Sequence, residues 1–208
     1  FNIVGRKKLE RLTALARRTQ ISVVADNAEV VAGLAEAGRN AGRKIVVLVE
    51  CDTGAHRNGA QSPQAALELA QTIDRTPGLE CGGLMTYAGV GQRLQAEKFL
   101  VEARELCRAA GLETKVITSG GSPDMWKDEG LSQLTEYRAG TYIYFDRSLA
   151  ERGTCAYSDC AVQVLATVVS RPTSERALID AGTKSLTSDL LGLQGYGAAH
   201  ELGDAQVY

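Results

Sequence analysis

Polar segments that could bind an anion or move a proton recur along the chain, each directly after an apolar stretch. They are Asp26-Asn27, Glu50–Arg57, Thr86-Tyr87, Thr118–Ser122 and Arg138–Thr141. The last two are small-residue turns rich in backbone N–H and hydroxyl groups, which can converge on one phosphate. Neither is a Walker motif or a GxGxxG fingerprint, so each turn taken alone is more simply a structural turn.

Arg57 is a candidate for a different reason. It follows a stretch that ends in two carboxylates, Glu50 and Asp52. An arginine that carboxylates hold in place can act on an anionic oxygen. A solvated loop cation is the alternative interpretation. Tyr87 is by default a half-buried tyrosine whose hydroxyl reaches water.

Alternating helical and strand periodicities predict the elements that position these segments. Helices are expected over residues 5–18, after the N-cap Asn27, after Ser62-Pro63 and over about residues 92–110. Short runs of apolar and β-branched residues predict strands between and after these helices. The expected strands are 21–25, 44–49, 79–87, 114–118 and 141–145.

This β-α alternation with short connections predicts an α/β fold with a parallel sheet. Polar, Gly-rich clusters recur after the strands, so a (β/α)8 TIM-type barrel fits better than an open sheet. A closed barrel takes roughly 250 residues. We therefore expect a partial barrel over residues 1–150, with strands missing on its N-terminal side. The polar segments would then meet at the carboxyl ends of its strands.

A second, partial β-domain is expected over residues 151–208. Cys160–Ser170 is predicted to be a long strand, Arg171–Ser174 a turn and Arg176–Asp180 the returning strand of a hairpin. Thr183–Tyr208 is Gly-rich and predicted to be loop. Because the chain starts at Phe1 and both domains look incomplete, we expect it to be a piece of a longer protein.

Composition excludes several classes of protein. The 208 residues carry a formal net charge of −2 and 44% hydrophobic residues, as soluble globular chains do. Dispersed charge predicts no nucleic-acid partner, and no apolar run approaches the roughly 20 residues of a membrane span. Five cysteines without CxxC spacing indicate free thiols in a reducing, cytoplasmic compartment. His56 and His200 have no ligand partner three or four residues away, so they predict no metal site.

Several motifs together resemble the D-threonine aldolase and D-serine dehydratase family. Their order and spacing match over nearly all of the chain, and the combination is specific although each motif is not. More distantly the chain is similar to the alanine racemase barrel of the fold-type III pyridoxal-phosphate enzymes. The matching motifs are Asp52-Thr53-Gly54, Arg57-Asn58-Gly59, Thr118–Ser122, Tyr137–Asp146, Leu165–Pro172 and Ile179–Asp189.

The resemblance implies a homodimeric pyridoxal-phosphate enzyme that acts on a small D-amino acid, assisted by a divalent metal (Mn, Mg or Zn). By position, Arg57 would approach the ring 3-oxygen and Tyr87 would lie near the ring. Arg138 is the candidate partner of the pyridine nitrogen. Some relatives carry a tyrosine a few residues beyond Thr141 that contacts the phosphate, whereas the corresponding stretch here reads Asp146-Arg147-Ser148-Leu149.

The same resemblance implies the residues that hold the cofactor phosphate. Ser122, Gly140 and Thr141 would bind it, helped by the backbone of Gly120 and Gly121. These residues belong to the two small-residue turns described above, so the implied role agrees with the chemistry of the turns.

The resemblance places two functional elements outside this chain. The family's Schiff-base lysine precedes the segment matched by residues 1–5, and its metal ligands, a His and an Asp or Cys, follow Tyr208. Lys184 belongs to a β-domain motif and Lys44 opens a strand at the wrong end, so neither is a substitute. We therefore predict no catalytic residue and no metal ligand within the chain.

The implied chemistry is that of a lyase. The stretch 180–192 reads closer to the aldolase branch, which favours cleavage of D-threonine to glycine and acetaldehyde. D-serine dehydratase, which forms pyruvate and ammonia, is the main alternative, and an amino acid racemase is a weaker one. A non-catalytic pyridoxal-phosphate carrier is the alternative from a different class.

Overall fold

The computed structural model describes residues 2–127, 132–199 and 205–207, and His200 lies outside them. The chain divides into two compact units, Phe1–Ala139 and Gly140–Tyr208, and each is described by itself. The predicted domains 1–150 and 151–208 stay a prediction.

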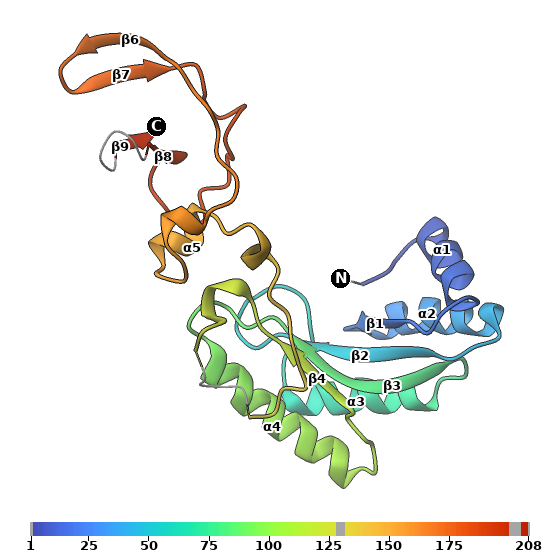
Figure 1. Cartoon of the computed structure of the whole chain (residues 1–208). Coiled ribbons are helices and arrows are strands. Elements are labelled where there is room, and N and C mark those ends of the chain that lie inside the picture. Colours follow the sequence, from blue (N-terminus) through green and yellow to red (C-terminus); the bar gives the residue numbers. More distant parts are fainter. Residues whose placement is uncertain (1, 128–131, 200–204, 208) are drawn as a thin grey trace. The chain divides into compact units, whose positions relative to one another are not determined.

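The first unit alternates helices with the strands of one sheet (Figure 1). Its strands pair in parallel in the order β1-β2-β3-β4-β5. This sequential order is that of a (β/α)8 barrel rather than of a doubly wound sheet, whose order reverses. The predicted α/β class is confirmed. The elements are α1 (Arg6–Ala16), β1 (Ser22–Ala25), α2 (Ala28–Ala41), β2 (Ile45–Cys51), α3 (Pro63–Arg75), β3 (Leu79–Thr86), α4 (Arg93–Ala109), β4 (Val116–Ser119), a 3-10 helix (Ser122–Asp124) and β5 (Glu136–Tyr137).

Local capping signals fix where these helices begin and end. The Asn27 side chain accepts a hydrogen bond from the Val30 N–H at 2.9 Å, as its predicted N-cap role requires. Ser62 Oγ accepts one from the Ala65 N–H at 3.1 Å. Gly42, with a φ of 67°, ends α2 in the left-handed conformation that glycine adopts without strain.

Substituting Ser62→Ala is expected to lower the free energy of unfolding by about 1 kcal/mol, because the Ala65 N–H loses its side-chain acceptor. Urea unfolding measures this difference. Ser62→Asp keeps an acceptor at the N-cap and is the matched control, which should unfold at the wild-type urea concentration. Equal losses in both variants would contradict a capping role.

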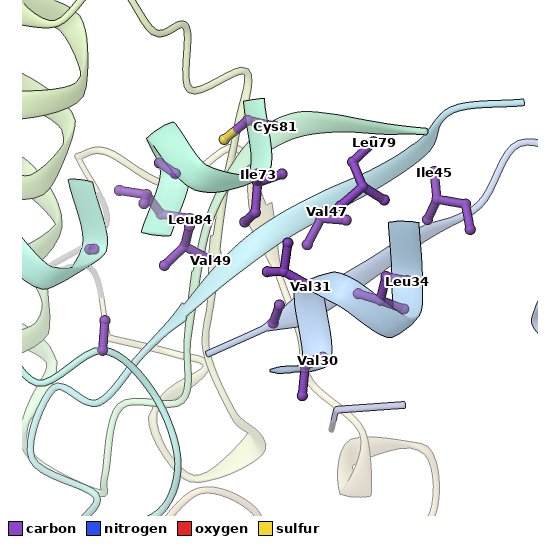
Figure 2. Packing of buried hydrophobic residues seen from close by; sticks show 14 of the residues in the cluster. Val30, Val31, Leu34, Ile45, Val47, Val49, Ile73, Leu79, Cys81 and Leu84 are labelled. Atoms are coloured by element: carbon purple, nitrogen blue, oxygen red, sulfur yellow. The ribbon is translucent and has the colours of Figure 1, made fainter. Parts of the chain in front are cut away.

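The core of the first unit lies between the helices and one face of the sheet (Figure 2). Along β2, Val47 and Val49 belong to this core together with Leu34 of α2 and Ile73 of α3. Because side chains alternate along a strand, Glu50 points to the opposite face. The helices therefore seal one side of the sheet and leave the chemistry to the other face and to the strand ends.

The second unit contains a hairpin, as predicted, but its elements differ from the predicted ones. Strands β6 (Val168–Thr173) and β7 (Arg176–Ile179) pair antiparallel. The predicted long strand Cys160–Ser170 is wrong in extent, because β7 offers a partner only to the residues from Val168 onward. The predicted turn Arg171–Ser174 is also displaced, since β6 continues through Thr173.

Two further predictions for the second unit need correction. The strand expected at 141–145 is wrong: Thr141–Ile143 is a 3-10 helix, and the Phe145 N–H donates to the Thr141 carbonyl at 2.8 Å. This local bond closes a turn and leaves no extended backbone to pair. The segment expected to be loop beyond Thr183 contains β8 (Gly197–Ala199) and β9 (Ala205–Val207), an antiparallel pair. The remaining elements of the unit are α5 (Arg147–Glu151) and a 3-10 helix (Tyr157–Asp159).

Within the described residues, no helix combines the length and apolar character that crossing a membrane requires.

Candidate functional site

The carboxyl ends of β2, β3, β4 and β5 lie side by side, and four of the predicted polar segments follow them. This adjacency is a consequence of parallel pairing, which brings equivalent ends of neighbouring strands to one edge. The register pairs at this edge are Cys51 with Thr86, Met85 with Thr118, and Ser119 with Tyr137.

Arg138 ties three of these strand ends together. Its Nη1 donates to Thr118 Oγ1 at 2.7 Å and its Nη2 to the Thr86 carbonyl at 2.7 Å. Burial lowers the pKa of the Arg138 guanidinium, and the carboxylates of Glu136 and Glu50 oppose this effect. The side chain still carries its charge, since an arginine does not deprotonate in a protein. A fixed cation therefore lies at this edge of the sheet.

Glu50 is the least expected side chain of this region. It is 2% exposed, and among the described residues its Oε2 atom has no hydrogen-bond partner. A buried carboxylate oxygen without a partner is unfavourable and uncommon in folded proteins, and typical of functional sites. Sequence reasoning treated Glu50 only as a partner for Arg57. The signal that could have singled it out is a lone acid inside an otherwise apolar strand.

Arg57 lies over the ring of Tyr87, with its guanidinium carbon 4.7 Å from the ring centroid. This distance is within the range of a cation–π contact. Asp52 shapes the loop that carries Arg57, because its carboxylate accepts hydrogen bonds from the N–H groups of Gly54 and His56 at 3.0 Å. Desolvation raises the pKa of Asp52. The hydrogen bonds that its carboxylate accepts together lower the pKa by more, so it lies below its ordinary value.

The turn Gly120–Ser122 passes between two tyrosine rings. A Cβ atom on Gly120 would lie 2.8 Å from the Tyr137 ring, and one on Gly121 would lie 3.4 Å from the Tyr87 ring. Tyr137 Oη also donates to the Gly121 carbonyl at 2.9 Å. Gly120 has a φ of 111°, so both its conformation and its surroundings require glycine. The turn therefore presents backbone and the Ser122 side chain at the end of β4.

The structure brings most of the predicted cofactor-binding residues into one region and leaves two in the other unit. Arg57, Tyr87, Arg138 and the Gly120–Ser122 turn share the carboxyl edge of the sheet. Gly140 and Thr141 begin the second unit, where Thr141 opens a 3-10 helix. Tyr137 opens a motif matched in the sequence but was assigned no role in the site, because a tyrosine in a strand does not by itself indicate a function.

A metal site is not apparent in the same region. Across residues 2–127, 132–199 and 205–207, no group of three or more His, Cys, Asp or Glu side chains is arranged to hold a metal ion.

Comparison with known sequences gives two family matches along the chain. Residues 3–148 match the family described as the N-terminal domain of alanine racemase, and residues 161–207 match a putative serine dehydratase domain. D-threonine aldolase from Arthrobacter sp. is 34% identical over 201 residues, which are 90% of this chain and 53% of that protein. D-threo-3-hydroxyaspartate dehydratase from Delftia sp. (strain HT23) is 33% identical over 198 residues, 88% of this chain and 52% of that protein.

Solved structures give the same picture. The crystal structure of D-threonine aldolase from Filomicrobium marinum superposes with a TM-score of 0.76 at 29% identity, over 90% of this chain and 55% of that one. D-threo-3-hydroxyaspartate dehydratase from Delftia sp. HT23 superposes with a TM-score of 0.78 at 30% identity, over 89% and 53%. The chain thus spans about half the length of the relatives it matches.

Proposed function

The chain belongs to the family of the alanine racemase N-terminal domain, and from this membership we propose that its protein is a pyridoxal-phosphate-dependent lyase of D-3-hydroxy amino acids. One observation carries the proposal: relatives that are 33–34% identical over about nine-tenths of the chain are an aldolase and a dehydratase of such compounds. Cleavage of D-threonine to glycine and acetaldehyde is the favoured activity.

A dehydratase is the second candidate function, and a specific observation supports it. The D-threo-3-hydroxyaspartate dehydratase is nearly as similar to the chain as the aldolase, at 33% against 34% identity. D-serine dehydratase from Dictyostelium discoideum is 26% identical over 170 residues, a weaker match. A dehydratase would release ammonia and a 2-oxo acid from the same class of substrate.

The residues at the carboxyl edge of the sheet fit pyridoxal phosphate. Gly120, whose Cβ would collide with a tyrosine ring, leaves room for backbone donors beside the hydroxyl of Ser122, a combination suited to a phosphate. Arg57 and Arg138 offer guanidinium donors for the ring oxygen and the ring nitrogen, and Tyr87 borders the ring. When bound, the cofactor supplies an electron sink for the carbanion of the substrate. Gly140 and Thr141, which begin the second unit, stay predicted phosphate-binding residues.

The roles of the chain's own side chains follow from their contacts. Arg138 cannot give up its proton, so toward the ring nitrogen of a bound cofactor it would act as a hydrogen-bond donor and not as an acid. Its two bonds to Thr118 and Thr86 fix the guanidinium before any ligand arrives, which lowers the entropic cost of binding. Glu50 places a negative charge near Arg138 and partly offsets its positive charge.

Three further proposals concern the complete protein. The described residues offer no donor set that fits a divalent metal, so Mn, Mg or Zn stays a prediction for the complete protein. A homodimer and a cytoplasmic location also stay predictions. The five cysteines are free in the structure, which supports a reducing compartment for the protein.

The experiment that tests the function uses the complete protein, because the 208 residues alone are predicted to be inactive without the lysine and the metal ligands. The purified complete protein is incubated with pyridoxal phosphate, Mn²⁺ and one of three substrates: D-threonine, D-serine or D-threo-3-hydroxyaspartate. We expect glycine and acetaldehyde from D-threonine, detected by chromatography and by an alcohol dehydrogenase assay. L-threonine is the matched control and should remain intact. Ammonia with a 2-oxo acid as the main products would establish the dehydratase instead. Interconversion of enantiomers alone would contradict both lyase activities.

A further inference from the structure

Arg93, the first residue of α4, is a cation in a place that disfavours one. It is 8% exposed, and its Nη2 atom has no hydrogen-bond partner among the described residues. Burial of an incompletely paired charge is unfavourable, and the positive end of the helix dipole repels a cation in the first turn. Its Nη1 donates to the Asp124 carbonyl at 3.3 Å. Both effects make this position unfavourable for an arginine, which indicates that Arg93 has a function that offsets them.

Asp124 extends this contact into a link between two loops. Its side chain is 8% exposed, and Oδ2 accepts a hydrogen bond from the Gly91 N–H at 3.1 Å. Its Oδ1 forms an ion pair with Lys127 Nζ at 2.8 Å. Arg93 and Asp124 thus connect the start of α4 with the segment that follows β4. Two loops that succeed neighbouring strands are held to each other by charge-assisted contacts.

The link between Arg93 and Asp124 is adjacent to the glycine turn of the site, because Asp124 follows the turn along the chain. Asp124 ends the 3-10 helix Ser122–Asp124, so its position sets that of Ser122 two residues earlier. Ser122 itself is 3% exposed. Arg93 and Asp124 line a small cavity whose other walls include Gly120, Gly121 and the rings of Tyr87 and Tyr137.

We propose that Arg93 and Asp124 are positioning residues that hold the Gly120–Ser122 turn in the conformation that binds the cofactor phosphate. The inference rests on the proposed function, since it assumes that this turn receives a phosphate. Neither residue needs to touch the cofactor. Arg93 anchors the carbonyl of Asp124, Asp124 anchors the Gly91 N–H, and the turn is held at its C-terminal end. Tyr137, which donates to the Gly121 carbonyl, holds its middle.

The test compares two ligands that differ only in the phosphate group. Apoprotein is titrated with pyridoxal phosphate and with pyridoxal, and the dissociation constants are measured by absorbance and fluorescence. Arg93→Met removes the charge and the hydrogen bond with little change in length. We expect a loss of about tenfold or more in affinity for pyridoxal phosphate. The affinity for pyridoxal should stay within about twofold.

Two companion variants keep the experiment decisive if Arg93→Met folds poorly. Arg93→Lys retains a cation and one donor, so it should restore part of the affinity for pyridoxal phosphate. Asp124→Asn retains an acceptor for Gly91 but loses the charge, and we expect a smaller selective loss. Arg108→Met, on the exposed side of α4, is the matched control, since Arg108 forms a surface ion pair with Glu105. Thermal unfolding of each variant measures its stability.

The outcomes separate this inference from the proposed function. Equal losses of affinity for both ligands in Arg93→Met would overturn it, because that is what a general structural role predicts. Unchanged affinity for both would overturn it as well. If wild-type protein bound pyridoxal phosphate no better than pyridoxal, the phosphate site itself would be wrong, and the proposed function would fail first.

Discussion

Gly83→Ala is expected to lower the free energy of unfolding by about 3–5 kcal/mol, because strain in the backbone and a collision add up. Gly83 has a φ of 141°, which only glycine adopts readily, and a Cβ atom there would lie 1.9 Å from the Val116 carbonyl oxygen. Gly83 pairs with Val116 in the parallel register of β3 and β4. The obstructing atom is backbone, so relief requires the two strands to separate.

Urea unfolding of wild type and variant measures this loss. Gly42→Ala is the matched control, because Gly42 also has a positive φ, 67°, but nothing lies within 4 Å of its Cβ position. The control should lose only about 1 kcal/mol, the strain part of the effect. Since β4 carries Thr118 and the glycine turn, Gly83→Ala should also weaken cofactor binding. A loss equal to that of Gly42→Ala would contradict the collision.

Arg138→Met is expected to lower kcat/KM by about 10²-fold, since a fixed donor at a site of developing charge contributes on that scale. The substitution removes the guanidinium that bonds Thr118 Oγ1 and the Thr86 carbonyl, and with it the proposed partner of the pyridine nitrogen. It leaves Glu50 on the same face without the cation that opposes its charge. We therefore expect the largest loss in kcat, with a weaker effect on cofactor affinity.

Steady-state kinetics and cofactor titration of the variants check this expectation. Arg138→Lys keeps the charge but cannot reach both acceptors at once, so it should recover only part of the activity. Arg104→Met is the matched control, since Arg104 is an exposed cation of α4 that bonds Gln133 away from the site. It should match wild type. Wild-type kcat in Arg138→Met would exclude a role at the reacting ring.

The sequence by itself determined most of the first unit. Asn27 and Ser62 predicted helix starts that the structure confirms, because N-capping is a contact between residues three positions apart. Apolar periodicity predicted β2 and β3 for a similar reason, since a buried strand reads as apolar at both faces. The alternation of strands and helices along the chain then predicted a parallel sheet, because short β-α connections allow few topologies.

In the second unit, local sequence did not predict the extent of the strands correctly. Val162–Thr167 has the composition of a strand, yet regular pairing begins only at Val168, opposite Ile179. Strand formation depends on a partner at a matching register, and the length of β7 sets how much of the segment is paired. The strand predicted at 141–145 was wrong for a similar reason, because local backbone hydrogen bonds fold this β-prone segment into a 3-10 turn.

Family motifs in the sequence identified Arg57, Tyr87, Arg138 and the Gly120–Ser122 turn as parts of a site, since residue type and spacing suffice for a match. Only the tertiary structure singled out the orphaned oxygen of Glu50 and the buried pair of Arg93 and Asp124. A charged residue in a sequence looks the same whether it is solvated or buried. Its burial and its partners depend on strands and loops that are distant along the chain and meet only in the folded protein.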